Sequence, residues 1–170
     1  MQKKISYGKN VYGRKEISAV IKTLNRSTQM GKSVEIFENK IAKLFSKNYG
    51  LMVNSGSSAL ILALKVMNFP KGSEVIAPCL NFGTAVSSIM LSNLNPIFVD
   101  CDIETLQIDL DKIESKISKR TKALLIPNLI GNIPDWRKIK KIALKYKLKI
   151  IEDSADTLGA TINKKSTGIY

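Results

Sequence analysis

The sequence predicts an α/β fold in which a mostly parallel sheet is flanked by helices. Short apolar runs alternate along the chain with segments whose apolar residues recur at helical spacing. The runs are apolar almost throughout, as in strands that helices cover on both faces of a parallel sheet. With 170 residues, of which 44% are hydrophobic and 24% charged, the chain has the size and composition of one globular domain.

The expected elements begin with helices and continue as alternating strands and helices. Residues 1–45 are expected to be a helical N-terminal segment that packs outside the sheet, with helices near 14–27 and 33–47 and a glycine-containing loop between them. The expected strands cover residues 49–53, 74–78, 95–100, 122–127 and 148–153. The expected helices among these strands cover residues 54–67, 83–94 and 135–147, with a short helix that starts after Asp109.

Two of these helices carry local signals. Asp109 is a favourable N-cap for the short helix, and Asp111 adds a negative charge to its first turn. The helix at 135–147 is amphipathic, because its apolar residues fall on one side of a helical wheel. The residues on that side are Trp136, Ile139, Ile142, Ala143 and Tyr146.

The chain is strongly basic, with 27 Lys and Arg residues against 14 Asp and Glu residues and a net charge of +13. Such a charge is typical of proteins that bind nucleic acid or acidic small molecules. Residues 112–149 hold 12 of the basic residues, mostly on the polar sides of expected helices and without interleaved aromatic residues. We therefore expect a solvated lysine-rich face and no nucleic-acid partner, with a weak field that attracts anions.

The residue types exclude several kinds of site. The chain contains no His, which removes Ser/His and Cys/His catalysis, and its two cysteines cannot close a tetrahedral zinc site, so no metal is expected. Cys79 and Cys101 are expected to be buried free thiols, which suits a reducing cytoplasm. No apolar run approaches the ~20 residues that cross a bilayer, and the N-terminal sequence does not resemble a signal peptide. We therefore expect no association with a membrane.

Small and hydroxylated residues follow the first expected strand. In parallel sheets covered by helices, ligands bind beyond the carboxyl ends of the strands. There the sequence NSGSS at 54–58 leads directly into a helix, whose free N–H groups can bind an anion. Gly56 lets the backbone approach a ligand, and Ser57 and Ser58 can add hydroxyl hydrogen bonds. A simple serine cap of the helix is an equally open alternative.

An aromatic residue and a carboxylate stand at two other strand ends. Phe82 follows strand 74–78 in a loop, where it can pack in the core or stack on a planar ring. Asp153 ends the apolar strand 148–153, where a carboxylate is costly unless a positive group pairs with it. An anion site, a stacking ring and a carboxylate together fit pyridoxal 5′-phosphate (PLP), which needs an acid to keep its pyridinium protonated.

The order and spacing of several motifs resemble those of the DegT/DnrJ/EryC1/StrS family of PLP-dependent sugar aminotransferases. The motifs are VNSGSSALILAL, GSEVIAPCLNFGTAVSSI, NPIFVDCDIETLQID, LLIPNLIGN and IIEDSADTLGA. The segment RKEISAVIKTLNRSTQMGKSVEIFENKIAKLF resembles the opening helices and glycine loop of the family, so the resemblance spans nearly the whole chain.

The resemblance implies a fold, partners and a role. The fold is the large domain of type I PLP-dependent transferases, and the family forms homodimers with sites at the subunit interface. The substrates implied are a nucleotide sugar and an amino donor such as glutamate, in surface polysaccharide or lipopolysaccharide biosynthesis. By position, Gly56, Ser57 and Ser58 would hold the cofactor phosphate, Phe82 would stack on its ring, and Asp153 would pair with its ring nitrogen.

The resemblance also suggests substrate contacts. Asn128 follows strand 122–127 at a position near the cofactor or substrate in the family. Gly31 and Lys32 would lie in a loop that reaches the sugar nucleotide. Glu152, by contrast, is expected to point to the opposite face of its strand from Asp153 and to be structural.

Part of the family pattern is missing from residues 1–170. The Schiff-base lysine of the family, or the histidine that replaces it, is expected beyond Tyr170, together with the C-terminal small domain. Lys164 and Lys165 lie in an expected hairpin turn and do not match the lysine motif. The resemblance therefore implies that residues 1–170 are the N-terminal portion of the large domain, and we expect this portion alone to be inactive.

Asp156 departs from the common family pattern, which has an amide at this position. An acid here, together with LIGN at 129–132, resembles the branch that removes the C3 oxygen of 4-keto-6-deoxyhexose nucleotides with pyridoxamine 5′-phosphate (PMP). Asp156 would belong to the cofactor-binding residues in that branch, whereas a cap of the following turn is the structural alternative. Three hypotheses stay open: an aminotransferase, a 3-dehydrase, and an inactive fragment or basic binding module.

Overall fold

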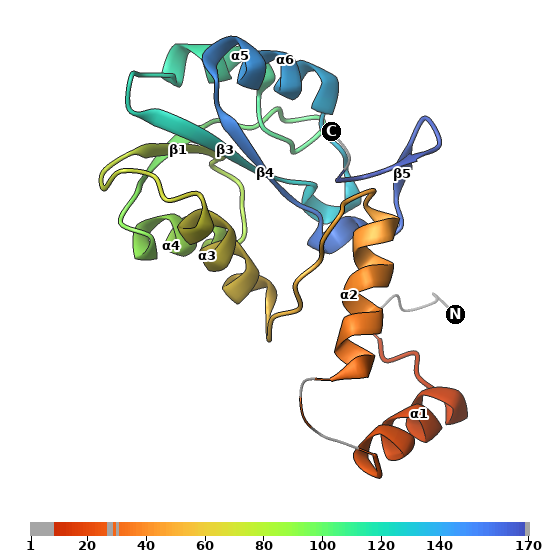
Figure 1. Ribbon diagram of the computed structural model, residues 1–170. Helices are drawn as coiled ribbons and strands as arrows, with labels where there is room; N and C mark the ends of the chain where they lie inside the picture. The colour runs from red at the N-terminus through yellow and green to blue at the C-terminus, as the bar shows by residue number, and fades with distance from the viewer. Residues whose placement is uncertain (1–8, 27–28, 30, 169–170) are drawn as a thin grey trace.

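The computed structural model describes residues 9–26, 29 and 31–168, and its centre is a four-stranded parallel sheet (Figure 1). The strands are β1 (Glu74–Pro78), β2 (Asn95–Val99), β3 (Thr121–Pro127) and β4 (Lys149–Asp153). They lie in the order β2-β1-β3-β4, and every neighbouring pair is parallel. All four carboxyl ends therefore meet at one edge of the sheet.

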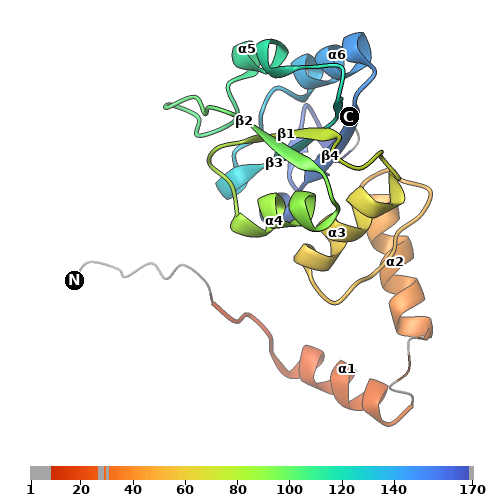
Figure 2. The ribbon, with the colours of Figure 1, turned by 90° about the vertical axis from the view of Figure 1, so that its left-hand side faces the viewer.

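Helices cover both faces of the sheet. Figures 1 and 2 show α3 (Gly56–Val66) and α4 (Gly83–Leu91) on one face, and α5 (Leu110–Ile113) and α6 (Trp136–Tyr146) on the other. Short 3-10 turns complete the connections: η1 (Glu114–Lys116), η2 (Leu129–Gly131) and η3 (Ala155–Thr157). This arrangement confirms the predicted fold class. None of the helices in the described ranges is long and apolar enough to cross a membrane.

The central strands are buried on both faces, which explains why their sequences are apolar throughout. In β1, Val75 and Ala77 belong to the cluster that α3 and α4 complete, whereas Ile76 belongs to the cluster of α5 and α6. In β3 the same alternation places Ala123 and Leu125 in the first cluster and Leu124 and Ile126 in the second. A strand with two buried faces cannot show the alternating pattern of a half-exposed strand.

The predicted helix signals are confirmed. The side chain of Asp109 accepts a hydrogen bond from the N–H of Asp111 at 3.1 Å and caps α5. The expected helix at 135–147 begins one residue later, because Asp135 is its N-cap and accepts from the N–H groups of Arg137 and Lys138 at 2.9 and 3.1 Å. The predicted apolar side of α6 packs in the core through Trp136, Ile139, Ile142 and Ala143, with Tyr146 partly buried against it.

The N-terminal helices lie outside the sheet, as expected. They are α1 (Arg14–Leu24) and α2 (Lys32–Leu44), and Figures 1 and 2 show α1 well away from the sheet. No residue of α1 is buried, and in α2 the one buried residue is Ala42. Of the predicted helical segment 1–45, residues 1–8, 27–28 and 30 lie outside the described residues, and residues 9–13 are not helical.

Two local expectations are wrong. Residues 49–53 form no strand, and the N–H of Met52 donates to the Glu38 carboxylate of α2 at 2.7 Å in place of a neighbouring strand. The cysteines are free but not buried, since Cys79 is exposed and Cys101 half-buried. Both cysteines lie just beyond the carboxyl ends of strands rather than inside them, which explains their exposure.

A small hairpin follows the sheet, formed by β5 (Thr161–Ile162) and β6 (Lys165–Ser166). Lys164 lies in its turn with a φ of 63°, as the sequence predicted, whereas Lys165 begins β6.

The amino end of the sheet carries a buried carboxylate, Glu74, at the first position of β1. Its Oε2 accepts hydrogen bonds from the hydroxyls of Ser118 and Thr121 at 2.5 and 3.1 Å, and its Oε1 lies 2.6 Å from the Arg120 guanidinium. The hydrogen bond from Ser118 is the main reason why the pKa of Glu74 lies below its ordinary value, against the opposing effect of burial. This carboxylate is fully satisfied by the chain itself.

Candidate active site

The ends of β3 and β4 bring several of the predicted site residues together. Pro127 pairs with Asp153 in the parallel register, and the N–H of Asn128 donates to the Asp153 carbonyl at 2.9 Å. Phe82 follows β1, the neighbour of β3, after a short loop. The topology therefore places Phe82, Asn128 and Asp153 at the edge of the sheet where the sequence predicted a ligand site.

The N-terminus of α3 offers donors for an anion. Ser55, not Ser57 or Ser58, is the N-cap, and its Oγ accepts from the N–H of Ser58 at 3.1 Å. Because Ser55 takes the capping role, the backbone N–H groups of Gly56 and Ser57 have no acceptor in the described part of the chain. A Cβ added at Gly56 would meet nothing within 4 Å, so the space in front of the helix start is open. Ser55 thus takes the cap, and the anion contact expected of Ser57 and Ser58 stays a prediction.

Phe82 presents its ring to solvent. The residue is 69% exposed and stands as the N-cap of α4, with its N–H bound to the Asn81 side-chain oxygen at 2.8 Å. The core alternative for Phe82 is therefore wrong in this structure. The ring is free to stack on a planar ligand.

Asp153 keeps part of its carboxylate open. Its Oδ1 accepts one hydrogen bond, from the N–H of Ala155 at 3.1 Å, and the side chain is half-buried. Within the described ranges, no Lys or Arg lies within ion-pair distance of it, and its Oδ2 has no donor. A half-buried carboxylate without a positive partner costs free energy that a protonated ring nitrogen would offset.

These observations fit PLP or PMP. The open start of α3 suits the phosphate, the exposed Phe82 ring suits the pyridine face, and the unpaired oxygen of Asp153 suits the ring N–H. The contacts themselves stay predictions.

Asn128 is less available than the sequence suggested. Its side chain is buried, and its Nδ2 lies 2.9 to 3.2 Å from side-chain oxygens of Glu152, Ser154 and Thr157. Its Oδ1 accepts from the indole N–H of Trp136 at 2.9 Å. The amide thus links the start of α6 to the end of β4, and the substrate contact proposed for it stays a prediction.

Glu152 has the structural setting that was expected. Its Oε1 accepts from the side chains of Asn128 and Ser154 and from the N–H of Gly168 at 2.8 to 2.9 Å. Unlike Asp153 one residue later, this carboxylate has several donors from its own chain.

Asp156 contacts the other feature that departs from the common pattern. Its Oδ2 accepts from the backbone N–H of Ile130 at 3.0 Å, which joins it to the LIGN segment at 129–132. It therefore does not act as a simple cap of the turn that follows it. Ile130 has a φ of 52° and a ψ of 24°, a left-handed conformation that costs a β-branched residue about 1–3 kcal/mol.

Gly31 and Lys32 lie apart from the strand ends. Gly31 is the N-cap of α2 and Lys32 its first residue, so the expected loop position is wrong for Lys32. Figure 1 shows this start of α2 at the end of the helix remote from the sheet, on the side of α1. The contact with a sugar nucleotide that was expected of these two residues stays a prediction.

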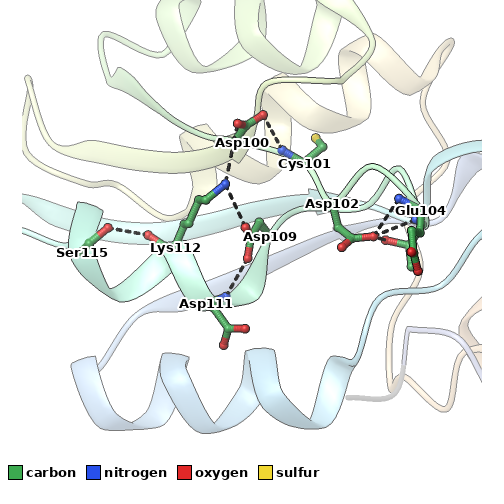
Figure 3. Close-up of polar contacts among 9 residues, drawn as sticks. Asp100, Cys101, Asp102, Glu104, Asp109, Asp111, Lys112 and Ser115 are labelled. Carbon is green, nitrogen blue, oxygen red and sulfur yellow. Dashed lines mark hydrogen bonds and ion pairs between the residues drawn. The ribbon is translucent and has the colours of Figure 1, made fainter.

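An acidic segment beyond β2 is held by the chain itself. Figure 3 shows Lys112 between Asp109, at 3.0 Å, and Asp100, at 3.7 Å. The hydrogen bond to Asp109 raises the pKa of Lys112 and lowers that of Asp109. Asp102 accepts from the N–H of Thr105 at 2.8 Å, which lowers its pKa. In the ranges described, no group of three or more acids or cysteines is arranged to hold a metal ion.

Two residues of this edge were missed from the sequence. The Nδ2 of Asn81, beside Phe82, is buried without an acceptor in the described part of the chain, and such a group calls for a partner. Its position between a strand and a helix was the available signal. Ile130 lies in the LIGN segment that the sequence singled out, but nothing predicted its positive φ, because isoleucine is among the residues least suited to it.

Two known proteins illustrate what the chain is similar to in sequence. The chain is 37% identical over 168 residues to GDP-4-keto-6-deoxy-D-mannose 3-dehydratase of Yersinia pseudotuberculosis. This match covers 95% of the chain and 43% of that protein. It is 38% identical over 139 residues to dTDP-3-amino-3,6-dideoxy-alpha-D-galactopyranose transaminase of Aneurinibacillus thermoaerophilus, covering 82% of the chain and 38% of that protein.

A solved structure shows the same fold. It is Escherichia coli GDP-4-keto-6-deoxy-D-mannose-3-dehydratase with bound hydrated PLP, with a TM-score of 0.88 and 32% identity over 94% of this chain and 43% of that one. The chain thus spans less than half the length of the relatives it matches. The family model of the DegT/DnrJ/EryC1/StrS aminotransferases matches residues 11–170, and the chain belongs to this family.

Proposed function

We propose that this chain supplies part of the cofactor site of a PLP-dependent aminotransferase that acts on a keto-sugar nucleotide. The observation that carries the proposal is Asp153, a half-buried carboxylate with an unpaired oxygen where β4 ends. The family and the sugar-nucleotide transaminase among the relatives support the reaction class. The solved relative with bound PLP supports the cofactor.

Each residue has a role that follows from its surroundings. The N–H groups of Gly56 and Ser57 and the Ser57 hydroxyl donate to the phosphate, at a helix start whose dipole favours negative charge. Ser58 contributes through the Ser55 cap, and Phe82 limits the site with its ring face. Asp153 accepts the ring N–H and so holds a proton on the ring nitrogen. When bound, the cofactor supplies an electron sink for a carbanion beside it.

A second function is favoured by one specific contact. The bond between Asp156 and Ile130 joins the two features that resemble the 3-dehydrase branch. The 3-dehydratase relative from Yersinia pseudotuberculosis, which matches 95% of the chain, supports the same branch. The candidate reaction is loss of the C3 oxygen of a 4-keto-6-deoxyhexose nucleotide, with PMP as the working cofactor.

The partners and the compartment belong to the same proposal. The substrate is a nucleotide sugar, the amino donor is an amino acid such as glutamate, and the pathway is that of a surface polysaccharide or lipopolysaccharide. A homodimer is supported by the apolar side of α1, where Ile17, Val20, Ile21 and Leu24 are exposed. A cytoplasmic location is supported by two free cysteines, which suit a reducing compartment.

Product analysis tests the proposal. The protein, purified as its gene encodes it, is incubated with PLP, glutamate and a 4-keto-6-deoxyhexose nucleotide, and the nucleotide products are identified by mass spectrometry. An amino group in place of the keto oxygen supports transamination, whereas loss of the C3 oxygen supports dehydration. Residues 1–170 alone are expected to give neither product.

Two variants separate the site from the fold. Asp153→Asn removes the proposed partner of the ring nitrogen and should lower turnover at least tenfold. Glu74→Gln removes a carboxylate at the opposite end of the sheet and should leave both the product and the turnover unchanged. If the folded wild-type protein, saturated with cofactor, converts none of the nucleotide substrate, the proposal is contradicted for both reactions.

A further inference from the structure

The turn η2 holds the least favourable backbone conformation in the described part of the chain. Among the non-glycine residues with positive φ, Ile130 is the one with a β-branched side chain. Gly131 follows with a φ of 85°, so two successive residues are left-handed. Such a conformation persists only where its surroundings determine it, and it is typical of functional sites.

Three side chains determine this turn. The Asp156 carboxylate accepts from the N–H of Ile130 at 3.0 Å. The amide of Gln107 donates to the Leu129 carbonyl at 3.2 Å, and the amide of Asn132 donates to the Thr105 carbonyl at 2.9 Å. Of the three, Asp156 is the one that bonds to the strained residue itself.

Core packing does not explain the strain. The side chain of Ile130 is 64% exposed, so the unfavourable backbone buries little apolar surface. The turn directly follows β3, and the N–H of Asn128 at its start bonds to the carbonyl of Asp153. A strained turn thus presents an exposed apolar side chain two residues after Asn128, whose N–H bonds to the residue that carries the proposed cofactor contact.

We propose that Asp156 is a positioning residue, whose carboxylate holds the turn η2 and thereby presents Ile130 as an apolar contact for the sugar of the nucleotide substrate. In this role Asp156 acts through the backbone of Ile130, with which its carboxylate forms a hydrogen bond. The substrate half of this inference rests on the proposed function. The hydrogen bond and its effect on the turn do not.

Amide hydrogen exchange tests the positioning step without any cofactor. In Asp156→Ala the Ile130 amide should exchange at least about tenfold faster than in the wild type, because its acceptor is gone. Asp156→Asn keeps an acceptor oxygen and should restore most of the protection. Ile130→Gly removes the strain, so in that background Asp156→Ala should disturb the neighbouring amides of η2 much less.

Steady-state kinetics test the presentation step in the protein as its gene encodes it. Ile130→Ala should raise KM for the sugar nucleotide about three- to tenfold, with kcat and KM for the amino donor nearly unchanged. Asp156→Ala should raise the same KM, and it should add little in the Ile130→Ala background. Ile103→Ala is the matched control, because Ile103 is an 87% exposed isoleucine outside the turn.

The outcomes separate the two steps. Equal exchange of the Ile130 amide in wild type and Asp156→Ala overturns the positioning role. An unchanged KM in Ile130→Ala overturns the sugar contact. Complete lack of turnover by the folded wild type overturns the proposed function, and with it the sugar contact, whereas the exchange result still decides the positioning role.

Discussion

Two carboxylates at opposite ends of the sheet differ in the donors that surround them. Glu74, at the amino end of β1, is buried and is met by two hydroxyls and a guanidinium. Asp153, at the carboxyl end of β4, receives one backbone N–H and leaves an oxygen without a donor among the residues that the structure describes. Glu74 is the first residue of its strand and Asp153 the last of its own, and in parallel sheets ligands bind beyond the carboxyl ends of the strands.

The difference shows how a structural acid can be told from a binding acid. An acid that stabilises the fold draws its donors from the same chain, as Glu152 also does one residue before Asp153. An acid kept for a ligand gives up some of that stabilisation and retains an open oxygen. Glu74 and Glu152 should therefore matter for folding, and Asp153 for binding.

The largest expected effect is on the fold, at the amino end. Glu74→Ala leaves the hydroxyls of Ser118 and Thr121 without their acceptor and should lower the free energy of unfolding by about 2–4 kcal/mol. Urea unfolding at neutral pH measures it. Glu74→Gln keeps one acceptor oxygen and should cost less. A loss in Glu74→Ala below about 0.5 kcal/mol would remove the distinction between the two acids.

The next effect is on binding, at the carboxyl end. Asp153→Asn should weaken binding of PMP at least tenfold, about 1.4 kcal/mol, because the ring N–H loses its charged acceptor. Its free energy of unfolding should stay within about 0.5 kcal/mol of the wild type, since little of the fold depends on this side chain. Calorimetric titration with PMP and urea unfolding give the two numbers. Destabilisation with unchanged PMP binding would reverse the assignment.

The sequence was sufficient where local rules decide the structure. The two-sided burial of β1 and β3 and the cap at Asp109 follow from composition and spacing. The failure at residues 49–53 has a different physical cause, which is a contact between residues distant along the chain. Residues 49–53 looked like a strand but bond to Glu38 of α2, and no local pattern shows that contact.

The candidate site shows the same contrast between local and long-range signals. Asp153 and Phe82 lie at the predicted edge of the sheet because topology alone brings the strand ends together. The amide of Asn128 is occupied by Trp136 and Glu152, and the carboxylate of Asp156 reaches Ile130 across 26 positions. These contacts depend on how β3, β4 and α6 pack together, which the linear sequence does not display.

A smaller effect distinguishes the serines at the start of α3. Ser55→Ala removes the cap and should lower the free energy of unfolding by about 1 kcal/mol. Ser57→Ala should leave unfolding unchanged, because its hydroxyl caps nothing, but should weaken PMP binding a few-fold. Each variant is the control of the other. Loss of stability in Ser57→Ala without loss of affinity would mean that Ser57 belongs to the fold.

The smallest expected effect is the pH dependence of the contribution that Glu74 makes to the free energy of unfolding. The pKa of Glu74 lies below its ordinary value of 4.5 in the folded state, so the unfolded state binds a proton first as the pH falls. Its contribution to stability is therefore complete above 4.5 and is lost as the pH falls through the folded-state pKa. The loss is smaller than in Glu74→Ala, because a protonated carboxyl still bonds to Ser118 and Thr121. Urea unfolding measures the difference in the free energy of unfolding between wild type and Glu74→Gln, and this difference should narrow as the pH falls below 4.5. A difference that widens there would contradict the assignment.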